Sequence, residues 1–436
     1  MNTYTNIQTY HTPRMYRLVG KYEGKIVKFC AAYSQSTSIL DILLTNRSEV
    51  MHMRGCSLFL SLLLLLTPLA LGEQAEGVWM LAVSAGKADC ILLGVEGWTC
   101  MIDTGHARSM GKVKALMDLM GVDHLDAVFV THTDSDHIGG LDWLADSDIP
   151  IGAWYASAMY TDIKSEKKHP MVKAAKKRGE SVTFLRAGDS VTLPNATLTV
   201  LAPIQLNEND EDDNSLVMML DTAQGSMLLT GDMEGVEEAQ LLSSGQYLKC
   251  DVLKVPNHAD DDACSESFVD AVQPKLAVIC TDTAEKPETP DPRVLASLAT
   301  AGAETYVTQE ATGGILVRLE GGVPSARALE LEAPQAQVQI TDVIPGDDLI
   351  ELHNPGEALA LDGWYLWSSR GGELFPFPEG TVIGTGASLT VGTNTTKEGS
   401  YDLLWDDKKV VHRSKEDVLW LYAPNGMPVS SLSNGL

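Results

Sequence analysis

The sequence predicts an α/β domain followed by a smaller all-β domain, and three observations support this fold class. Between Trp79 and about Leu331, short runs rich in β-branched and apolar residues alternate with runs of helical spacing. Residues 332–338, composed of Glu, Ala, Pro, Gln and Val, are typical of a linker. After this segment, short strand-like runs are separated by Gly and Pro without a helical period, which predicts a β-sandwich over residues 339–436.

The expected elements of the first domain are short. Strands are expected at Trp79–Val83, Cys90–Leu93, Thr99–Ile102, Ala127–Val130, Thr197–Leu201, Met227–Leu229, Val252–Val255 and Leu276–Cys280. Helices with apolar residues at intervals of three and four are expected at Lys112–Met120, Ser265–Val272 and Arg293–Ala301.

The composition excludes several classes of protein. Hydrophobic residues make up 44% and charged residues 21% of the 436 residues, so a disordered, collagenous or multi-span membrane protein is excluded. The net charge of −27 argues against binding to nucleic acid or anionic lipid through bulk attraction. Any contact with nucleic acid must therefore be local.

Residues 51–72 have the pattern of a secretory signal peptide. The charge-free, leucine-rich stretch Ser57–Gly72 would be about 24 Å long as a helix, shorter than a hydrocarbon core of about 30 Å. Small residues lie at positions −3 and −1 of a cut after residue 72. An uncleaved anchor is the alternative, but we expect no stable membrane span and a mature first domain of residues 73–331. We interpret the patternless residues 1–50 as an over-long N-terminal extension.

The cysteines of the mature chain are few. An odd number remains after residue 72, and no CxxC pair suggests a thiolate metal site or a redox centre. A dense disulfide framework is therefore excluded, although one or two bridges are compatible with the sequence. Whether Cys90 pairs with Cys100 across their hairpin is open.

The strongest functional signal is residues 131–140, which read THTDSDHIGG and directly follow an expected strand. Side chains two residues apart share a face of an extended chain, so His132, Asp134 and Asp136 are expected to point together, with His137 joining them from the turn. Two imidazoles and two carboxylates so close together would repel one another or lose solvation unless a cation bound them. The motif therefore predicts one or two divalent metal ions. The glycines are expected to permit a tight turn into a following helix. The alternative is an acidic surface turn with incidental histidines.

Two further residues end apolar strands downstream. Asp232 ends the run Leu228–Asp232, and His258 ends the run Leu253–His258. Taken alone, Asp232 is also explained as a helix cap and His258 as a hydrogen-bonded loop residue. With the 131–140 motif they predict a two-metal site of nitrogen and oxygen ligands, which suits Zn²⁺ or Mn²⁺ and fits copper poorly.

These motifs resemble those of a known family. From Trp79 to about Glu320 the chain is similar to the metallo-β-lactamase fold and, within it, to the soluble hydrolase domain of the bacterial ComEC competence proteins, whose signature is HxDxDHxGG. The matching pieces occur in the family order at Val83–Asp89, Ile102–Gly105, Leu125–Gly140, Asn214–Val217, Leu229–Glu234 and Leu253–His258. The resemblance implies an αββα sandwich with metals at one edge of the sheets.

The resemblance also implies roles for the site residues. The implied ligands of two divalent ions, zinc or manganese, are His132, Asp134, Asp136, His137, Asp232 and His258. Asp232 would bridge the ions, and Asp136 and Lys254 are the implied catalytic residues. No third ligand for the first ion can be assigned, since Asn214 stands at a suitable place but a neutral amide is a poor ligand.

The chain departs from the family at several positions. Asn257 stands where the family has a first histidine, Ala88 replaces a glycine, and Asp291 precedes Pro292 where a histidine is usual. These departures favour a hypothesis of reduced or lost activity. The three aspartates at 260–262 either supply replacement carboxylates or form a solvated loop.

The second domain resembles the lamin tail family, an immunoglobulin-like sandwich. The matching pieces are Leu349–Gly356, Leu361–Leu366, Phe375–Ile383, Ser388–Gly392 and Val418–Gly426. Trp364 and Leu366 are expected to face inward, because alternation places them on one face of a strand. The implied role is binding or tethering to a surface or polymer ligand that the fold does not name.

Two charged segments bear on the substrate. The basic segment Lys164–Arg178, which contains His169, is expected to border the site and either hold phosphates or form a solvated helix face. The acidic loop Leu206–Asp213 either repels such a substrate or holds Ca²⁺.

Three functional hypotheses follow. The first is a secreted or cell-surface bacterial hydrolase, a phosphodiesterase or nuclease that cleaves DNA or another phosphodiester with a two-metal-activated hydroxide. The second is a lactam or lactone hydrolase on the same scaffold, since metals also polarise carbonyls. The third is a surface binding protein with an impaired hydrolase domain, in which the lamin-tail-like sandwich binds the ligand.

Overall fold

The computed structural model describes residues 15–22, 25–32, 76–208, 210–344, 348–397, 399–407, 410–412 and 414–436. Residues 1–70 and 71–436 form two separate compact units. In the first unit, β1 (Met15–Tyr22) and β2 (Lys25–Ala32) form an antiparallel pair. We did not expect strands in a segment interpreted as patternless, but its β-branched and aromatic residues favour them.

The predicted signal peptide at residues 51–72 lies outside the described residues, as does the rest of the N-terminal extension. Within the described part of the chain, no helix combines the length and the apolar character needed to cross a lipid bilayer.

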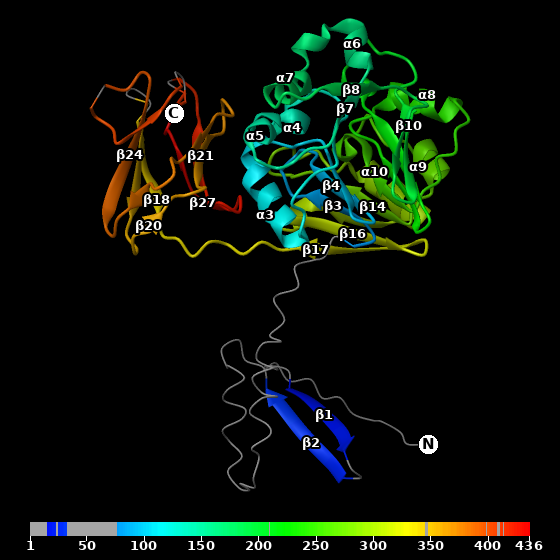
Figure 1. The fold of residues 1–436 in the computed structure, drawn as a ribbon, viewed down its shortest axis with the longest axis horizontal. Coiled ribbons are helices and arrows are strands. Elements are labelled where there is room, and N and C mark those ends of the chain that lie inside the picture. Colours follow the sequence, from blue (N-terminus) through cyan, green and yellow to red (C-terminus); the bar gives the residue numbers. More distant parts are fainter. Residues whose placement is uncertain are drawn as a thin grey trace. The chain divides into compact units, whose positions relative to one another are not determined.

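Two mixed sheets form the centre of the larger domain of the second unit (Figure 1). The strand order of the first sheet is β17 (Val323–Leu329), β16 (Gly314–Glu320), β3 (Val78–Val83), β4 (Ile91–Val95), β5 (Trp98–Ile102), β6 (Ala127–Val130), β7 (Trp154–Ser157) and β8 (Val182–Leu185). The order of the second is β15 (Glu304–Val307), β14 (Leu276–Ile279), β13 (Val252–Lys254), β12 (Gly225–Leu229), β11 (Val217–Thr222), β10 (Ala196–Ala202) and β9 (Ser190–Leu193).

Helices cover the outer faces of both sheets. Those that pack on the first sheet are α3 (Met110–Met120), α5 (Leu141–Asp146) and α7 (Pro170–Lys177). Those that pack on the second sheet are α8 (Gly235–Ser243), α9 (Glu266–Val272) and α10 (Pro292–Ala301). A third apolar core, which includes Met80, Phe129 and Val278, lies between the sheets. The predicted αββα sandwich is therefore confirmed.

Short helical segments complete this domain. They are η1 (Ala107–Ser109), α4 (Ser135–Ile138), α6 (Met159–Ile163), η2 (Glu166–Lys168), η3 (Asp212–Asn214), η4 (Pro256–Ala259) and η5 (Thr308–Glu310). All strands and helices predicted for this domain are present, with ends that differ by at most two residues. The chain between residues 154 and 185 and the hairpin of β16 and β17 were not predicted. β16 pairs with the distant β3, a contact that local sequence patterns do not reveal.

The smaller domain is the predicted all-β sandwich. One sheet contains β18 (Gln339–Ile344), β19 (Leu349–Asn354), β24 (Ala387–Thr393) and β25 (Leu403–Trp405). The other contains β22 (Leu374–Pro376), β21 (Tyr365–Ser368), β26 (Val418–Tyr422) and β27 (Pro428–Ser433), and β20 (Leu359–Ala360) pairs with β23 (Val382–Ile383). Trp364 and Leu366 are buried in its core, so the prediction that they face inward is confirmed.

Five cysteines of the second unit are buried and unpaired, namely Cys90, Cys100, Cys250, Cys264 and Cys280. Cys90 does not bond to Cys100, because Cys100 lies opposite Leu93 across the β4–β5 pair. The open question of this disulfide is thereby answered.

Candidate metal centre

The predicted site residues follow the carboxyl ends of strands in both sheets. The strands β5 to β8 are parallel to one another, and so are β12 to β15. The 131–140 motif follows β6, Asp232 follows β12 and His258 follows β13. Because the carboxyl ends of parallel strands share an edge, residues distant in sequence meet there.

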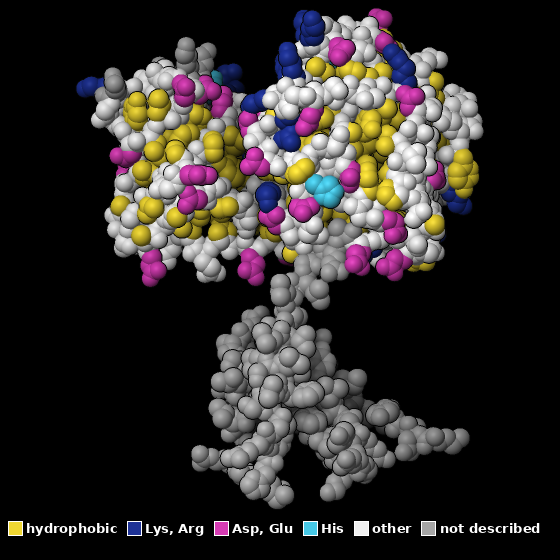
Figure 2. Space-filling model, in the orientation of Figure 1, with side chains coloured by type: hydrophobic (Ala, Val, Ile, Leu, Met, Phe, Trp, Pro, Cys, Tyr) yellow, Lys and Arg dark blue, Asp and Glu magenta, His cyan; other side chains and the backbone are white. Residues whose placement is uncertain are grey.

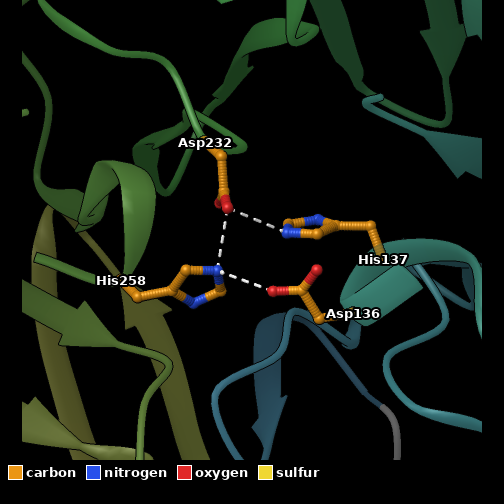
Figure 3. A group of neighbouring side chains, drawn as sticks. All are labelled: Asp136, His137, Asp232 and His258. Atoms are coloured by element: carbon orange, nitrogen blue, oxygen red, sulfur yellow. Dashed lines mark ion pairs between the residues drawn. The ribbon is translucent and has the colours of Figure 1, made fainter. Parts of the chain in front are cut away.

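Asp136, His137, Asp232 and His258 form one group, the inner cluster (Figure 3). Oδ2 of Asp232 lies 3.0 Å from Nε2 of His137 and 2.8 Å from Nε2 of His258. Oδ2 of Asp136 lies 3.5 Å from Nε2 of His258. Each residue contributes one ligand atom to a set that lies within 4.8 Å of one another, which is the arrangement that one bound cation needs.

His132, Asp134 and Asp212 form a second group, the outer cluster, within the same 4.8 Å limit. Nε2 of His132 lies 3.3 Å from Oδ1 of Asp212, and the ring of His132 lies 4.0 Å from the ring of His137, so the clusters are neighbours. Asp212 was not among the ligands predicted from the sequence, although it lies in the acidic loop Leu206–Asp213 noted above. Asn214 has the structural role that we expected, because its amide bonds to Asn207 and to the carbonyl of Asp210.

The expectation that His132, Asp134 and Asp136 point together holds for His132 and Asp134 but is wrong for Asp136. The strand ends at Val130, and Asp136 lies with His137 on the helical turn α4. Neighbouring residues on a helical turn diverge by about 100°, unlike those of a strand. The turn therefore sends Asp136 and His137 to the inner cluster and leaves His132 and Asp134 to the outer cluster.

Each histidine turns Nε2 toward the centre because Nδ1 is held from behind. Nδ1 of His137 lies 2.8 Å from Oδ2 of Asp103, which also accepts from the hydroxyl of Thr131. Nδ1 of His258 lies 2.6 Å from the carbonyl oxygen of Cys280. Such contacts fix the tautomer and the ring orientation of metal ligands. Asp103 belongs to the Ile102–Gly105 piece noted above, but it was given no role there.

The donor atoms fit a divalent ion. Within the described residues, the buried Nε2 atoms of His132, His137 and His258 and Oδ1 of Asp232 make no hydrogen bond of normal geometry, although each Nε2 lies within ion-pair distance of a carboxylate. Buried polar atoms are normally paired, and leaving one unpaired costs about 1–3 kcal/mol. Imidazole nitrogens and carboxylate oxygens are the donors that zinc and manganese accept, so these residues fit such an ion.

The pKa values show how strongly the site attracts positive charge. Burial lowers the pKa of His137, but the carboxylates of Asp232 and Asp103 outweigh it and raise that pKa well above its usual value. Burial and the neighbouring His137 lower the pKa of His132 to about 3, so this imidazole is neutral and free to bind a metal. Burial and nearby carboxylates raise the pKa of Asp212 to about 7. In the absence of a metal, protons therefore take the place of a cation.

Lys254 lies in the site as predicted, but its ammonium is enclosed. The side chain is 1% exposed and is ion-paired with Asp89. Nζ donates to the carbonyl of Gly231 at 2.8 Å and lies 3.6 Å from Oδ1 of Asp232. This geometry suits a residue that positions Asp232, and it does not expose Nζ to a substrate.

The residues that depart from the family lie outside both clusters. The Asn257 amide donates to Glu234 at 2.8 Å and to Asp262 at 3.1 Å. Asp291 caps α10 by accepting from the backbone N–H of Arg293. The alternative in which Asp232 caps α8 is wrong, because Glu234 holds the N-cap position.

The turn that presents His258 has an unusual backbone. Asn257, His258 and Ala259 all have positive φ, at 40°, 53° and 65°. Residues other than glycine adopt this region at a cost of about 1–3 kcal/mol each, and such strain gathers at functional sites. The strained backbone of this turn is therefore part of what places the His258 ring toward the centre of the site.

The motif glycines are required by close packing. Gly139 and Gly140 have φ of −58° and −87°, so the expectation of a special turn conformation is wrong. A Cβ at Gly139 would lie 2.7 Å from the backbone nitrogen of Ala107 and 2.7 Å from the carbonyl oxygen of Gly105. The glycines let α4 approach the loop after β5, which carries Asp103.

The charged segments pack against each other beside the outer cluster. Figure 2 shows Lys and Arg side chains over α6 and α7. Within this basic segment, Nζ of Lys164 lies 2.6 Å from Oε2 of Glu211, and Arg178 donates to backbone carbonyls. His169 is buried and accepts from the N–H of Met171 at the start of α7. Part of the segment thus has a structural role.

Three acidic residues form a further group beside this loop. Asp210, Asp213 and Glu234 meet the same 4.8 Å limit. Whether this group holds Ca²⁺ stays a prediction.

Asp260 is ion-paired with Lys286 and belongs to neither cluster, so the three aspartates at 260–262 do not replace a missing ligand.

Comparison with known proteins identifies the domains. Residues 83–283 match the model of the metallo-β-lactamase superfamily, and residues 332–435 match that of the lamin tail domain. The first domain is thus similar to metallo-β-lactamase domains and the second to lamin tail domains, so both predicted resemblances are confirmed.

The curated relatives are bacterial competence and recombination proteins. The chain is 27% identical to ComE operon protein 3 of Bacillus subtilis over 49% of its length, 25% identical to recombination protein 2 of Haemophilus influenzae over 53%, and 28% identical to competence protein ComA of Neisseria gonorrhoeae over 47%. It spans only 29%, 28% and 27% of the lengths of these relatives. The predicted ComEC-type resemblance therefore holds for the hydrolase domain.

Similar solved structures include the metallo-β-lactamase fold protein YhfI of Bacillus subtilis, at 12% identity and a TM-score of 0.34 over 55% of this chain and 99% of that one. Zn²⁺-bound PqqB of Methylobacterium extorquens is 11% identical, with a TM-score of 0.36 over 55% and 100%.

The packing at Gly139 generates a first prediction. Overpacking a protein core usually costs about 1–3 kcal/mol. We expect Gly139→Ala to lower the free energy of unfolding of residues 73–436 by more than this, because the added Cβ would clash with backbone atoms. Chemical unfolding followed by tryptophan fluorescence measures this change. Gly235→Ala is the matched control, because the nearest atom to its Cβ would be the Asp262 carbonyl oxygen at 3.3 Å. Equal losses in the two variants would contradict the packing explanation.

The raised pKa of His137 generates a second prediction. A group whose pKa is raised by folding stabilises the fold below its unfolded pKa, near 6.5, and loses that contribution as the pH rises through the folded pKa. The free energy of unfolding of chelator-treated protein should therefore fall as the pH rises above about 6.5, the usual pKa of histidine, and His137→Gln should flatten this decline.

The control for this prediction is His353→Gln, a change in the lamin tail domain, which should keep the decline of the unmodified protein. An excess of Zn²⁺ should add more stability at the upper end of the range, because metal ligands must be deprotonated. A decline that is the same with and without His137 would show that other groups cause it.

Proposed function

We propose that this protein is a secreted or surface-displayed bacterial phosphodiesterase, most simply a nuclease, that depends on two divalent ions. The observation that carries the proposal is the pair of neighbouring clusters at the carboxyl ends of the two sheets. Their donors are nitrogen and oxygen only, as in two-metal hydrolases of phosphate esters. The printed names of the relatives, competence and recombination proteins, favour DNA as the substrate.

The inner cluster would hold one ion and the outer cluster the other, with Asp232 as the bridge. Zinc and manganese suit these donors. Ions bound there would make water a stronger nucleophile and would neutralise charge that develops on the phosphate. Asp212 completes the outer set, for which sequence analysis found only two ligands.

The residues of the chain prepare the site for this chemistry. Asp103 holds Nδ1 of His137, so that Nε2 is free toward the centre. Lys254, paired with Asp89, lies beside Asp232 and balances its negative charge. In the inner cluster, Nε2 of His258 faces Oδ2 of Asp136 (Figure 3). Because these groups are positioned before a substrate arrives, little reorganisation is needed during the reaction.

The alternative of an impaired hydrolase domain rested on Asn257 and Asp291. The Asn257 amide donates to Glu234 and the Asp291 carboxylate caps α10, and these contacts outside the two clusters support a structural role for both residues. The lamin tail domain would then tether the enzyme to a surface or polymer, and the predicted signal peptide at residues 51–72 would export it.

The activity can be tested directly. We expect residues 73–436 loaded with Zn²⁺ or Mn²⁺ to cleave DNA or bis(p-nitrophenyl) phosphate, and chelator to abolish the cleavage. Asp136→Ala should lower kcat/KM by about 100-fold or more, as the loss of a ligand does. Equal rates for Asp136→Ala and the unmodified protein would falsify the proposal. A lactam and a lactone assayed in parallel separate the carbonyl-cleaving alternative.

The assignment of Asp212 can be tested by metal analysis. We expect Asp212→Asn to lower the zinc content by about one ion per chain, because an amide replaces a carboxylate donor. Elemental analysis after dialysis measures the content. Glu208→Gln is the matched control, since Glu208 is an exposed acid of the same loop and belongs to neither cluster. If both variants keep the full zinc content, Asp212 is not a ligand.

A further inference from the structure

The loop between β3 and β4, residues 84–89, carries a lysine to the rim of the inner cluster. Nζ of Lys87 donates to Oδ2 of Asp136 at 2.8 Å. The backbone N–H of Asp89 donates to the carbonyl of Asp136 at 3.2 Å, so loop and motif are joined at two points. Ala85, Ala88 and Asp89 of this loop are buried, so Lys87 is its charged residue that is open to solvent at the rim of the site.

Lys87 differs from Lys254 in its access to solvent. The side chain of Lys87 is 24% exposed and that of Lys254 is 1% exposed. Within the described residues, these are the two lysines ion-paired with carboxylates at the inner cluster. A substrate that arrives from solvent can therefore meet the ammonium of Lys87 and cannot meet that of Lys254.

Other cations near the rim are already engaged. Lys286 is ion-paired with Asp260, and Arg108 is ion-paired with Glu285. Glu285 also accepts from the backbone N–H of Lys87 at 3.3 Å, so it holds the loop while it neutralises Arg108. The positive charge that the rim offers to an incoming anion is thus concentrated at Lys87.

The contact with Asp136 leaves Lys87 donors for a substrate. An ammonium has three N–H donors, and Asp136 is its one hydrogen-bond acceptor among the described residues. When Asp136 shares its negative charge with a metal ion, it attracts the ammonium less strongly. The remaining donors then lie at the edge of the centre, where a non-bridging phosphate oxygen would be.

We propose that Lys87 binds a non-bridging oxygen of the substrate phosphodiester and makes the site select anionic phosphodiesters over uncharged esters. This inference rests on the proposed function, and it adds a substrate-binding residue that sequence analysis did not assign. A lysine placed there would bind phosphate as a point charge, which an uncharged substrate cannot use.

The test compares two substrates that differ in charge. Lys87→Met and Lys87→Arg are assayed against a p-nitrophenyl phosphodiester and the matching methylphosphonate ester, which lacks the negative charge. Lys87→Met should lower kcat/KM for the phosphodiester by about 100-fold, as loss of a charge-stabilising donor does, and by less than about threefold for the methylphosphonate. Lys87→Arg should restore most of the loss, because it keeps the charge.

Two controls separate this role from a structural one. Lys114→Met removes an exposed lysine paired with Asp118 on α3 and should change neither rate. Elemental analysis should find the same metal content in Lys87→Met as in the unmodified protein. Equal losses for both substrates, or a loss of metal, would overturn the inference in favour of a role in holding Asp136.

A binding measurement keeps the inference separate from the proposed function. Calorimetric titration of the metal-loaded protein with inorganic phosphate should show affinity at least about tenfold weaker in Lys87→Met, since one charged contact is lost. If the unmodified protein cleaves neither substrate, the proposed function fails and this titration alone decides the inference. Unchanged phosphate affinity would reject the role of Lys87.

Discussion

The buried carboxylate of Asp232 is the constraint on which the site depends. Its side chain is almost fully enclosed, and two imidazoles and the Lys254 ammonium surround it. Burial raises its pKa, but the neighbouring His137 and His258 outweigh burial and hold that pKa well below its usual value. A buried charge is tolerated only where opposite charge lies close, so the cluster must contain protons or a metal ion.

This constraint links the site to the packing of the sandwich. His137 follows a strand of the first sheet, whereas Asp232 and His258 follow strands of the second, and the apolar core between the sheets sets the distance across the edge. A change in that core would therefore alter metal binding without touching a ligand. In the same way, metal binding would stabilise the packed sheets, because the ligands are far apart in the unfolded chain.

The acidic loop shows how a surface segment can complete such a site. Glu211 accepts from the hydroxyl of Thr133 and is ion-paired with Lys164, so it ties the loop both to the motif and to the basic segment. Asp212 is thereby held beside His132. The basic segment thus helps to position Asp212, which is a different role from the phosphate binding that its charge alone suggested.

The sequence by itself determined the two domains and the elements with strong local patterns, because strand periodicity is a local signal. The prediction of six ligand residues came from the 131–140 motif, from Asp232 and His258 at the ends of apolar strands, and from the family resemblance. The sequence also indicated a divalent metal ion. Without a cation, clustered carboxylates repel one another and clustered polar groups lose contact with water. The tertiary structure decided how the candidate ligands group, that Asp212 lies beside His132, and that Asp103 and Lys87 contact His137 and Asp136. Those depend on α4 being a helical turn and on loops that meet across the sheet edge, and such contacts between distant segments leave no periodic trace in the chain.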